Sequence, residues 1–439
     1  MTRLSVASPA IAIDRPSARV LPYPWILAGA FVIGAAIALW VQHLVVPLGQ
    51  PFWGMFDNQL DLGVYRDGAR VVLDGQSLYH AKLLGVMDYT YTPISVVMFM
   101  PFTLMPFVAA QVVWVTLTFV ALYLTVMLSF RALGYRATMP LRVIAACLVV
   151  ILTLLEPVRS TIWFGQINAF LMLVIVWDLT RPRGSRWRGF SVGLTGGIKL
   201  TPLLFIPYLV FTRDFKAVRN SLLTFVATIA VGFAIMPGES WTYWTHSLMD
   251  SNRVGAPNTL GNQSLRGAIA NLENTAHPST ALWMALAVVA LVAAFFAATW
   301  ASQVGRELLA VTIIGLASAV VSPMSWGHHW VWVVPLTVIG IDRVVRSRTL
   351  VMRIAAVVAI VAVFLAMFAW PTYLPYPILY VQWWVPDAYL TGTFFLSSPS
   401  WLRWFVYDPY NWVFVFTVVA TVATLWWTRS KQNSTNSIS

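Results

Sequence analysis

Long uninterrupted apolar runs set the strongest limit on what this chain can fold into. They lie at about 25–47, 107–130, 143–156, 167–180, 189–211, 221–236, 281–302, 308–322, 330–341, 350–370 and 411–428. A helix needs roughly 20 apolar residues to cross a bilayer. Only 10% of the 439 residues are charged, whereas a soluble domain carries about 25%. The chain lacks a polar shell to cover these runs in water, which excludes a soluble enzyme, a coiled coil and a disordered chain.

The apolar runs are continuous rather than alternating between apolar and polar residues. Strands of a membrane β-barrel alternate with a period of two, so the pattern favours helices. The predicted fold is an all-α polytopic membrane protein with about 10–12 transmembrane helices, outer-face loops and short interfacial helices. The segment 93–106 is bracketed by Pro93 and Pro106, and it predicts one such interfacial or re-entrant helix.

The basic residues are distributed unevenly between the connecting segments. With the N-terminus in the cytoplasm, 20 of the 28 lysines and arginines fall in inner segments and seven in outer loops. This asymmetry satisfies the positive-inside rule. The net charge of +12 is therefore explained by basic residues that orient the protein in the membrane. We expect no nucleic-acid partner.

This orientation divides the chain into three parts. A cytoplasmic segment at 1–24 precedes a membrane domain at 25–428, and a polar cytoplasmic tail at 429–439 is expected to be disordered. The outer loops of the membrane domain are predicted at about 48–92, 157–166, 237–280, 322–329 and 371–410.

The run 189–211 is flanked by basic clusters on both sides, so a single crossing would leave one cluster outside. It also contains Gly193, Gly196, Gly197 and Pro202. We therefore predict two half-helices that enter and return on the cytoplasmic side. Broken helices of this kind are tolerated where they line a protein cavity.

Lys199 lies within this broken segment and is the most unusual charge in the sequence. A lysine in the middle of a membrane costs about 2.5–3.5 kcal/mol on insertion scales, so it needs a partner. One interpretation is a structural pair or a side chain that extends to the inner interface. The other is a counter-charge for an anionic ligand.

The first outer loop contains an amphipathic helical pattern over residues 62–73. Asp61 stands at its start, where a helix-capping carboxylate worth about 1 kcal/mol would sit. The alternative is a general base held outside the bilayer. Asp57, four residues earlier, is the competing base.

Gln166 and Asn168 lie where the outer loop 157–166 meets the next span. Their amides can donate to and accept from sugar hydroxyls. The alternative is the start of an interfacial helix with an aromatic belt. Glu156 and Arg159 are near in sequence and can pair.

Two further outer segments carry candidate ligand contacts. His328 and His329 are adjacent, and they lack the i, i+4 spacing of a metal site. A phosphate or sugar contact from one histidine is weighed against a buried interfacial imidazole. The loop 237–280 adds Asn262, Gln263 and Arg266 in an amide-rich stretch that suits carbohydrate.

Several familiar motifs are absent from the sequence. It contains no Gly-rich dinucleotide loop, no phosphate-binding P-loop and no CxxC metal site. The single cysteine, Cys147, excludes a disulfide framework. These absences remove any support for a nucleotide-sugar or ATP site.

Four patterns, in order along residues 57–330, resemble glycosyltransferase family 87 of the GT-C superfamily. They are Asp61-Leu62-x-Val64-Tyr65 with the later Tyr91-x-Pro93, Gly165-Gln166-x-Asn168, Lys199-x-x-Pro202, and Ser322-Pro323-x-Ser325-Trp326-x-His328-His329. The resemblance implies a GT-C-like catalytic bundle, with Asp61 as the catalytic aspartate.

The resemblance also implies the reaction. This reaction is the transfer of mannose, with inversion of configuration, from polyprenyl-phosphate mannose to a glycolipid acceptor. The acceptor that the resemblance favours is a phosphatidylinositol mannoside, extended through an α-1,2 linkage. The active site would face outward from the plasma membrane, within the lipid bilayer environment that both substrates share. A lipid-phosphate donor explains why no nucleotide motif is needed. The alternatives are an arabinofuranosyl or lipomannan-branching transferase, or a lipid or sugar transporter, which should show inverted repeats.

Charge and position assign the other candidate roles. The leaving phosphate would be stabilised by four cationic side chains, those of His328, His329, Lys199 and Arg266. The candidate contacts to sugar or acceptor are Tyr65, Gln166, Asn168, Asn262 and Gln263. Neither a cofactor nor a metal is predicted.

Overall fold

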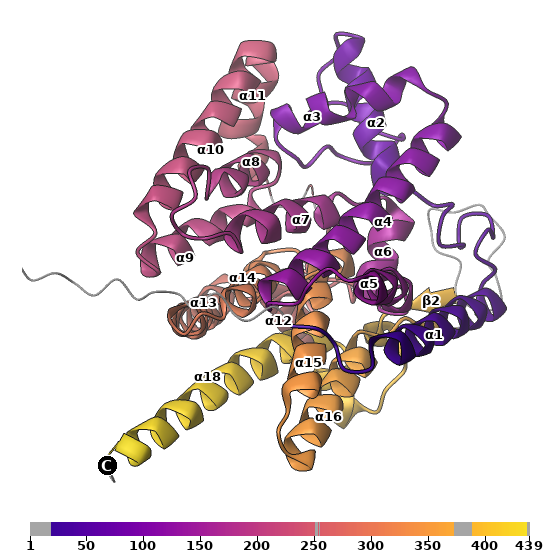
Figure 1. The fold of residues 1–439 in the computed structure, drawn as a ribbon. Helices are drawn as coiled ribbons and strands as arrows, with labels where there is room; N and C mark the ends of the chain where they lie inside the picture. The colour runs from indigo at the N-terminus through magenta and orange to yellow at the C-terminus, as the bar shows by residue number, and fades with distance from the viewer. Residues whose placement is uncertain (1–18, 251–252, 254, 373–388, 437–439) are drawn as a thin grey trace, which may run out of the picture.

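A computed structural model of the chain describes residues 19–250, 253, 255–372 and 389–436 (Figure 1). Helices make up almost all of its regular structure, which confirms the predicted all-α fold class. The only strands in these ranges are β1 (Trp370–Thr372) and β2 (Tyr389–Thr391). They pair antiparallel, with Trp370 opposite Thr391.

Six helices of the described chain are long and apolar enough to cross a membrane. They are α1 (Pro24–Val45), α4 (Phe107–Ala132), α10 (Phe215–Ile235), α13 (Thr280–Gln303), α16 (Leu350–Met367) and α18 (Pro409–Asn436). Only 6% to 39% of each apolar stretch is buried inside the protein. Apolar surface of this extent is not left exposed to water by a soluble protein, so the chain is a multi-pass membrane protein.

The shorter apolar runs form shorter helices, most of which are packed in the protein core. These are α5 (Met139–Leu152), α6 (Glu156–Phe164), α7 (Asn168–Leu179), α14 (Glu307–Val321) and α15 (Val333–Arg346). The pair α6 and α7 is bent by 117° and would count as a seventh crossing if taken as one span. In α14 every residue from Leu308 to Leu316 is buried, which places this helix among other helices rather than against lipid.

The run 189–211 is divided into two short helices, as predicted. They are α8 (Phe190–Ile198) and α9 (Phe205–Phe211), with a 3-10 turn η2 (Thr201–Leu204) before the second. Lys199 is extended, with φ −143° and ψ 127°, and it interrupts the helix. The break therefore places this lysine where two helices separate.

The glycines of this segment allow α8 to approach α10 closely. A methyl group on Gly193 would lie 2.1 Å from the carbonyl oxygen of Ser221, and one on Gly197 would lie 2.1 Å from the hydroxyl of Thr228. Such small residues let membrane helices pack backbone against backbone. This contact fixes the position of the break at Lys199 relative to α10.

The predicted amphipathic helix of the first outer loop is present as α2 (Leu60–Leu73). The segment predicted to be interfacial forms α3 (Pro93–Phe99) and η1 (Met100–Leu104). Figure 1 shows α2 and α3 together at one end of the molecule. The remaining short elements are α11 (Pro237–Thr245), η3 (Ser247–Met249), α12 (Leu265–Glu273), η5 (Gly327–Trp330), η6 (Thr393–Phe395), η7 (Ser400–Leu402) and α17 (Arg403–Val406).

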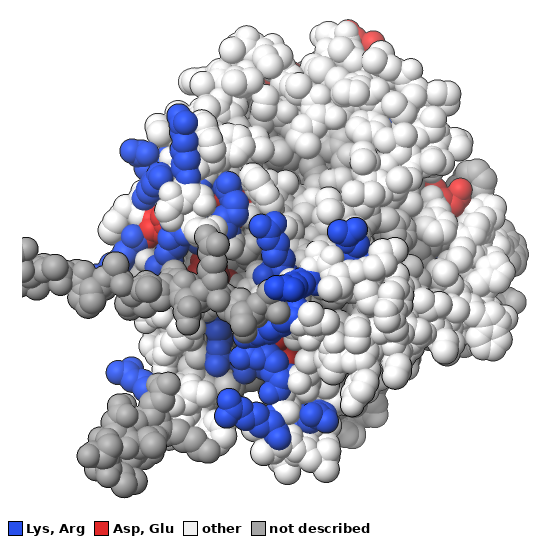
Figure 2. Space-filling view, in the orientation of Figure 1, with Lys and Arg blue, Asp and Glu red and all other residues white. Residues whose placement is uncertain are grey.

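Lysine and arginine gather in one region of the face shown in Figure 2, away from the part formed by α2 and α3. Basic residues occupy the last turns of α4 and α15. Both helices end in segments predicted to be cytoplasmic. The segregation of charge therefore follows the pattern expected from the sequence.

Some predicted segments fall partly beyond the described residues. Residues 1–18 of the N-terminal segment, 251, 252 and 254 of the loop 237–280, 373–388 of the loop 371–410, and 437–439 of the tail lie outside them. Helix α18 continues to Asn436. The expectation of a disordered tail is therefore wrong for residues 429–436, because the last membrane helix extends past its apolar stretch.

A buried ion-pair network ties together the ends of several helices. Arg188 is 1% exposed and contacts carboxylate oxygens of Asp214 and Glu307, each at 2.8 Å. It also donates to the carbonyl oxygens of Leu179 and Arg181. These contacts join the segment before α8 to α7, to α14 and to the start of α10.

Arg188→Ala should strongly destabilise the protein, because Asp214 and Glu307 would lose their buried partner. Removing one member of a buried pair costs about 3–5 kcal/mol. Thermal unfolding of the detergent-purified protein measures the loss. Arg186→Ala is the matched control, because Arg186 is exposed and stacks only on Trp187. Equal unfolding temperatures for the two variants would contradict the structural importance of the network.

Candidate active site

Asp61 lies in the first turn of α2 but does not cap the helix. The N-cap position is Gln59, and no side chain there forms a capping hydrogen bond. The Asp61 carboxylate instead accepts a hydrogen bond from Nε2 of Gln166 at 2.7 Å. Asp57, the competing base, is exposed and accepts a bond from the backbone N–H of Phe52 at 2.6 Å. The helix-cap interpretation of Asp61 is therefore wrong.

The end of α6 brings Gln166 to Asp61. Gly165 ends α6 with φ +70°, a conformation that suits glycine. A methyl group there would lie 2.6 Å from the side-chain oxygen of Gln59. Gln59 in turn donates to the carbonyl oxygen of Ile162 at 2.6 Å. This close approach joins two segments about 100 residues apart and aims the next residue, Gln166, at α2.

Burial raises the pKa of Asp61 from its ordinary 3.8 to about 6. The N–H of Gln166 and the positive charge of Lys199 oppose this rise, but desolvation is the larger effect. A carboxyl group that titrates near neutral pH can accept a proton and also release it. Asp61 is thus suited to serve as a general base.

Two tyrosines complete the surroundings of Gln166. The Tyr65 hydroxyl lies 3.2 Å and the Tyr91 hydroxyl 3.3 Å from Oε1 of Gln166. The two hydroxyls are 2.9 Å apart. Tyr65 is a predicted site residue, whereas Tyr91 had no role assigned to it. The sequence signal that could have identified Tyr91 is its place in the Tyr91-x-Pro93 pattern.

Lys199 is surrounded by three neutral acceptors. Its ammonium donates to Oδ1 of Asn168 and to Nε2 of His329, each at 3.0 Å, and to the Tyr91 hydroxyl at 3.4 Å. The Asn168 amide is oriented by its own bond to the carbonyl oxygen of His328 at 2.9 Å. Among the described residues, no carboxylate forms a salt bridge with Lys199. Its charge is therefore available to an anionic ligand.

The two histidines differ in their surroundings. The rings are perpendicular, with centroids 4.8 Å apart, and only His329 reaches Lys199. His328 packs against Phe164, with ring centroids 5.7 Å apart. Burial, reinforced by the nearby Lys199 charge, lowers the pKa of both imidazoles well below the ordinary 6.5. The prediction that these histidines are cationic is therefore wrong, because both imidazoles are neutral at ordinary pH. Since Nε2 of His329 accepts the bond from Lys199, the single ring proton of His329 is on Nδ1.

The three candidates from the loop 237–280 contact other parts of the protein. Asn262 accepts a bond from the backbone N–H of Ser325 at 2.9 Å, and Gln263 donates to the carbonyl oxygen of Tyr407 at 2.7 Å. The Arg266 guanidinium lies 5.5 Å from the centre of an indole ring of α13. None of the three has a hydrogen bond to Asp61 or Lys199 within the described structure. The Asn262 amide and the backbone N–H of Gln263, which donates to the carbonyl oxygen of Ser325 at 2.7 Å, instead hold the segment before His328 in place.

Glu156 and Arg159 do not pair with each other. Glu156 accepts a bond from the Tyr410 hydroxyl at 2.6 Å, and Arg159 donates to the side-chain oxygen of Gln42 at 2.9 Å. The expectation of an ion pair is wrong because each side chain is turned toward a different helix. In the described ranges, no group of three or more His, Cys, Asp or Glu side chains is arranged to hold a metal ion.

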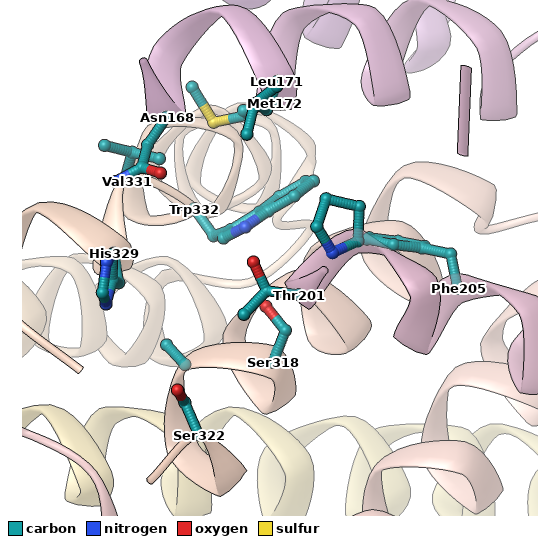
Figure 3. Close-up of a pocket in the computed structure, with 12 residues that line it drawn as sticks. Asn168, Leu171, Met172, Thr201, Phe205, Ser318, Ser322, His329, Val331 and Trp332 are labelled. Carbon is teal, nitrogen blue, oxygen red and sulfur yellow. The ribbon is translucent and has the colours of Figure 1, made fainter. Parts of the chain in front are cut away.

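A small cavity opens beside His329 and Asn168 (Figure 3). Its walls come from α7, η2, the start of α9, α14, η5 and the residues that follow α14 and η5. Most of them are apolar, and the lining residues are Asn168, Leu171, Met172, Thr201, Pro202, Phe205, Ser318, Ala319, Ser322, His329, Val331 and Trp332. An apolar space thus adjoins the polar cluster around Lys199.

Comparison with known proteins gives a family match over the central part of the chain. The family described as "Glycosyltransferase family 87" matches residues 89–323. In Mycobacterium tuberculosis, a "Polyprenol-phosphate-mannose-dependent alpha-(1-2)-phosphatidylinositol mannoside mannosyltransferase" is 35% identical over 317 residues, 67% of this chain and 74% of the relative. A second protein of that species, named for a phosphatidylinositol pentamannoside, is 36% identical over 303 residues, 66% of this chain and 68% of the relative.

A more distant relative has a different named activity. An "Alpha-(1->3)-arabinofuranosyltransferase" of Mycobacterium tuberculosis is 26% identical over 169 residues, 36% of this chain and 37% of the relative. No solved structure gives a significant match.

The pKa of Asp61 predicts how Asp61→Asn affects stability. Because the folded-state pKa of about 6 exceeds the ordinary 3.8, the folded protein binds the proton more tightly than the unfolded chain. Wild-type stability should therefore fall as pH rises from about 4 to 6 and stay lower above that range. At pH 7.5, Asp61→Asn should be more stable than wild type by on the order of 1–3 kcal/mol.

Thermal unfolding of the purified proteins between pH 4 and pH 8 tests this expectation. Asp57→Asn is the matched control, since Asp57 is exposed and asparagine keeps an acceptor for the Phe52 N–H. If Asp61→Asn were less stable than wild type at pH 7.5, burial of the ionised Asp61 carboxylate would not be destabilising, and the expectation would be wrong.

Proposed function

This chain belongs to glycosyltransferase family 87, and from that membership we propose that it transfers mannose from polyprenyl-phosphate mannose to a phosphatidylinositol mannoside through an α-1,2 linkage. Its glycosyltransferase class follows from the family match over residues 89–323. The donor, acceptor and linkage are supported by the names of relatives 35% and 36% identical to it. One observation carries the proposal: the carboxylate of Asp61 and the cation of Lys199, which forms no salt bridge within the described residues, belong to one hydrogen-bonded cluster.

Asp61 serves as the general base in this proposal. Its carboxylate takes the proton from an acceptor hydroxyl as the hydroxyl oxygen attacks the anomeric carbon of mannose. Its pKa of about 6 leaves it mostly ionised at neutral pH and still basic enough to accept the proton. The contact with Gln166 supports this role, because the amide holds one carboxylate oxygen of Asp61 in place at 2.7 Å.

Lys199 and His329 bind the leaving phosphate. As the new carbon–oxygen bond forms, the bond between the anomeric carbon and the phosphate oxygen breaks, and the electron pair stays on the phosphate. The ammonium of Lys199 and the Nδ1 proton of His329 stabilise that growing charge. Direct displacement inverts the configuration, so a β-linked donor yields an α-mannoside and polyprenyl phosphate.

In this proposal, the small cavity beside His329 offers an apolar surface to the first carbons of the isoprenoid chain. Leu171, Met172, Phe205 and Trp332 give it apolar walls, while Asn168 and His329 lie at its polar edge. A lipid phosphate has the same division into an apolar tail and an anionic head. The contact between cavity and cluster is thus matched to a lipid-linked donor rather than a nucleotide sugar.

The proposed location is the plasma membrane, with the site facing outward. Six apolar helices support membrane insertion, and the basic residues gather away from α2 and α3 (Figure 2). Under the positive-inside rule, the basic region faces the cytoplasm. Asp61 on α2 then lies near the outer leaflet, where a lipid donor and a glycolipid acceptor can both reach it.

The purified protein should transfer mannose in detergent when it is given polyprenyl-phosphate mannose and phosphatidylinositol mannosides of different lengths. Mass spectrometry of the product and linkage analysis identify the acceptor and the bond. Arabinofuranose on the same lipid phosphate should not be used. Use of that donor would favour the arabinofuranosyl alternative, and absence of any sugar transfer in detergent would favour transport.

Asp61→Asn should lower mannose transfer by at least about 100-fold, because general-base catalysis contributes roughly 10²–10⁴-fold. Asparagine has nearly the same shape but cannot accept the proton. Asp57→Asn should retain transfer near the wild-type level in the same assay. If Asp61→Asn were active and Asp57→Asn inactive, the base would be Asp57.

Lys199→Ala should lower kcat/KM for the lipid donor by about 100-fold, the effect typical of removing one charge-stabilising donor. His329→Ala should act in the same direction, while KM for the glycolipid acceptor should change little. Initial rates at varied donor and acceptor concentrations separate these effects. Lys82→Ala is the control, because Lys82 is exposed and paired with Asp88. Unchanged donor kinetics in both site variants would contradict this phosphate site.

A further inference from the structure

A continuous chain of hydrogen bonds connects Lys199 to Asp61. The Lys199 ammonium lies 3.4 Å from the Tyr91 hydroxyl, which lies 3.3 Å from Oε1 of Gln166. Nε2 of the same amide lies 2.7 Å from Oδ2 of Asp61. The cation at one end and the carboxylate at the other are thus linked through only two intervening side chains.

The direction of this chain is determined by its charged end. An ammonium group has three hydrogens to donate and no acceptor. Tyr91 therefore accepts from Lys199. It also accepts from the Tyr65 hydroxyl at 2.9 Å, so its own hydrogen is directed to the oxygen of Gln166. Because one end of the amide is thereby occupied as an acceptor, its NH₂ end must face Asp61. Tyr65 adds a second hydroxyl next to the same oxygen, at 3.2 Å.

We propose that Tyr91 is a positioning residue that fixes the Gln166 amide with its N–H toward Asp61 and so keeps this base ionised. Tyr65 assists at the same amide oxygen. The role assigned to Asp61 rests on the proposed function, whereas the orientation of the amide rests on the contacts themselves. Neither tyrosine takes part in proton transfer, because both act through Gln166.

The orientation matters because the two ends of an amide have opposite effects on a carboxyl group. An N–H donor stabilises the ionised form, whereas a carbonyl oxygen can be accommodated only when the carboxyl carries a proton. The titratable groups that face Asp61 are Tyr65 on α2, Tyr91 before α3 and Lys199 after α8. Burial raises the pKa of both tyrosines above the ordinary 10, so both remain hydroxyl donors.

Tyr91→Phe removes the hydroxyl but keeps the ring beneath the Lys199 ammonium, whose nitrogen lies 5.2 Å from the ring centre. The amide oxygen then has only the Tyr65 hydroxyl beside it, and because no ammonium directs that hydroxyl, the amide can turn its oxygen toward Asp61. The acidic limb of the pH profile of kcat/KM for mannose transfer should move upward by about one pH unit. For a wild-type midpoint near pH 6, this shift lowers the rate about fivefold at pH 6 and leaves it near wild type at pH 9.

Tyr89→Phe is the matched control, because Tyr89 is a fully buried tyrosine of the same aromatic cluster. Its hydroxyl bonds to Ser95 at 2.6 Å and not to Gln166. Its pH profile should have the wild-type midpoint. Tyr65→Phe should show a smaller upward shift than Tyr91→Phe, because Tyr91 would still occupy the amide oxygen. Coincident profiles for Tyr91→Phe and wild type, or an equal shift in Tyr89→Phe, would overturn the proposal.

A second measurement follows the ionisation of Asp61 without any substrate. The unfolding temperature of wild type minus that of Asp61→Asn, plotted against pH, reports the titration of this carboxyl group. The same difference, measured between Tyr91→Phe and the double variant Tyr91→Phe/Asp61→Asn, should change at a higher pH. A shift here with no mannose transfer by wild type would reject the proposed function and keep the positioning role. Mannose transfer by wild type, together with no shift of the Asp61 titration in Tyr91→Phe, would keep the proposed function and reject the positioning role.

Discussion

The site depends on a lysine held at the break between two short helices without a carboxylate partner among the described residues. Lys199 is placed there because α8 ends at Ile198 and the chain is extended at the next residue. Three neutral acceptors occupy its hydrogens, so hydrogen bonding is satisfied while the positive charge is not neutralised. An uncompensated charge in such surroundings is expensive. The uncompensated charge is explained if the ligand that binds this site carries the balancing negative charge.

The same lysine gives direction to the polar groups around it. On one side its bond at 3.0 Å leaves the His329 proton on Nδ1, beside an apolar cavity. On the other side, its donors determine how Tyr91 and then Gln166 are oriented, as far as Asp61. In the proposed reaction, the phosphate-binding side and the base side of the site are therefore organised by one cation. The break that creates this position depends on close packing of α8 against α10, which the glycines allow.

Much of the fold was predictable because its signals are local. Apolar length predicted the membrane helices, the basic clusters flanking 189–211 predicted two short helices, and the amphipathic pattern predicted α2. Local signals were less successful where a neighbour decides the role. The position of Asp61 fitted a helix cap as well as a base, and only the contact with Gln166 in the folded protein excludes the cap. Likewise, the amide of Asn262 suited a sugar, but it is bonded to the Ser325 backbone.

The sequence by itself determined the membrane class, the helical elements, the family resemblance and the residues that carry charge into the apolar region. The tertiary structure decided which of those residues meet. Asp61 and Gln166 are 105 positions apart, and Lys199 and His329 are 130 apart, distances over which helical periodicity holds no information about contact. The contacts of Tyr91 with Lys199 and Gln166 likewise depend on tertiary packing. The orientation of a buried amide or imidazole is set by its hydrogen-bonding partners, and those partners come together only when the helices pack.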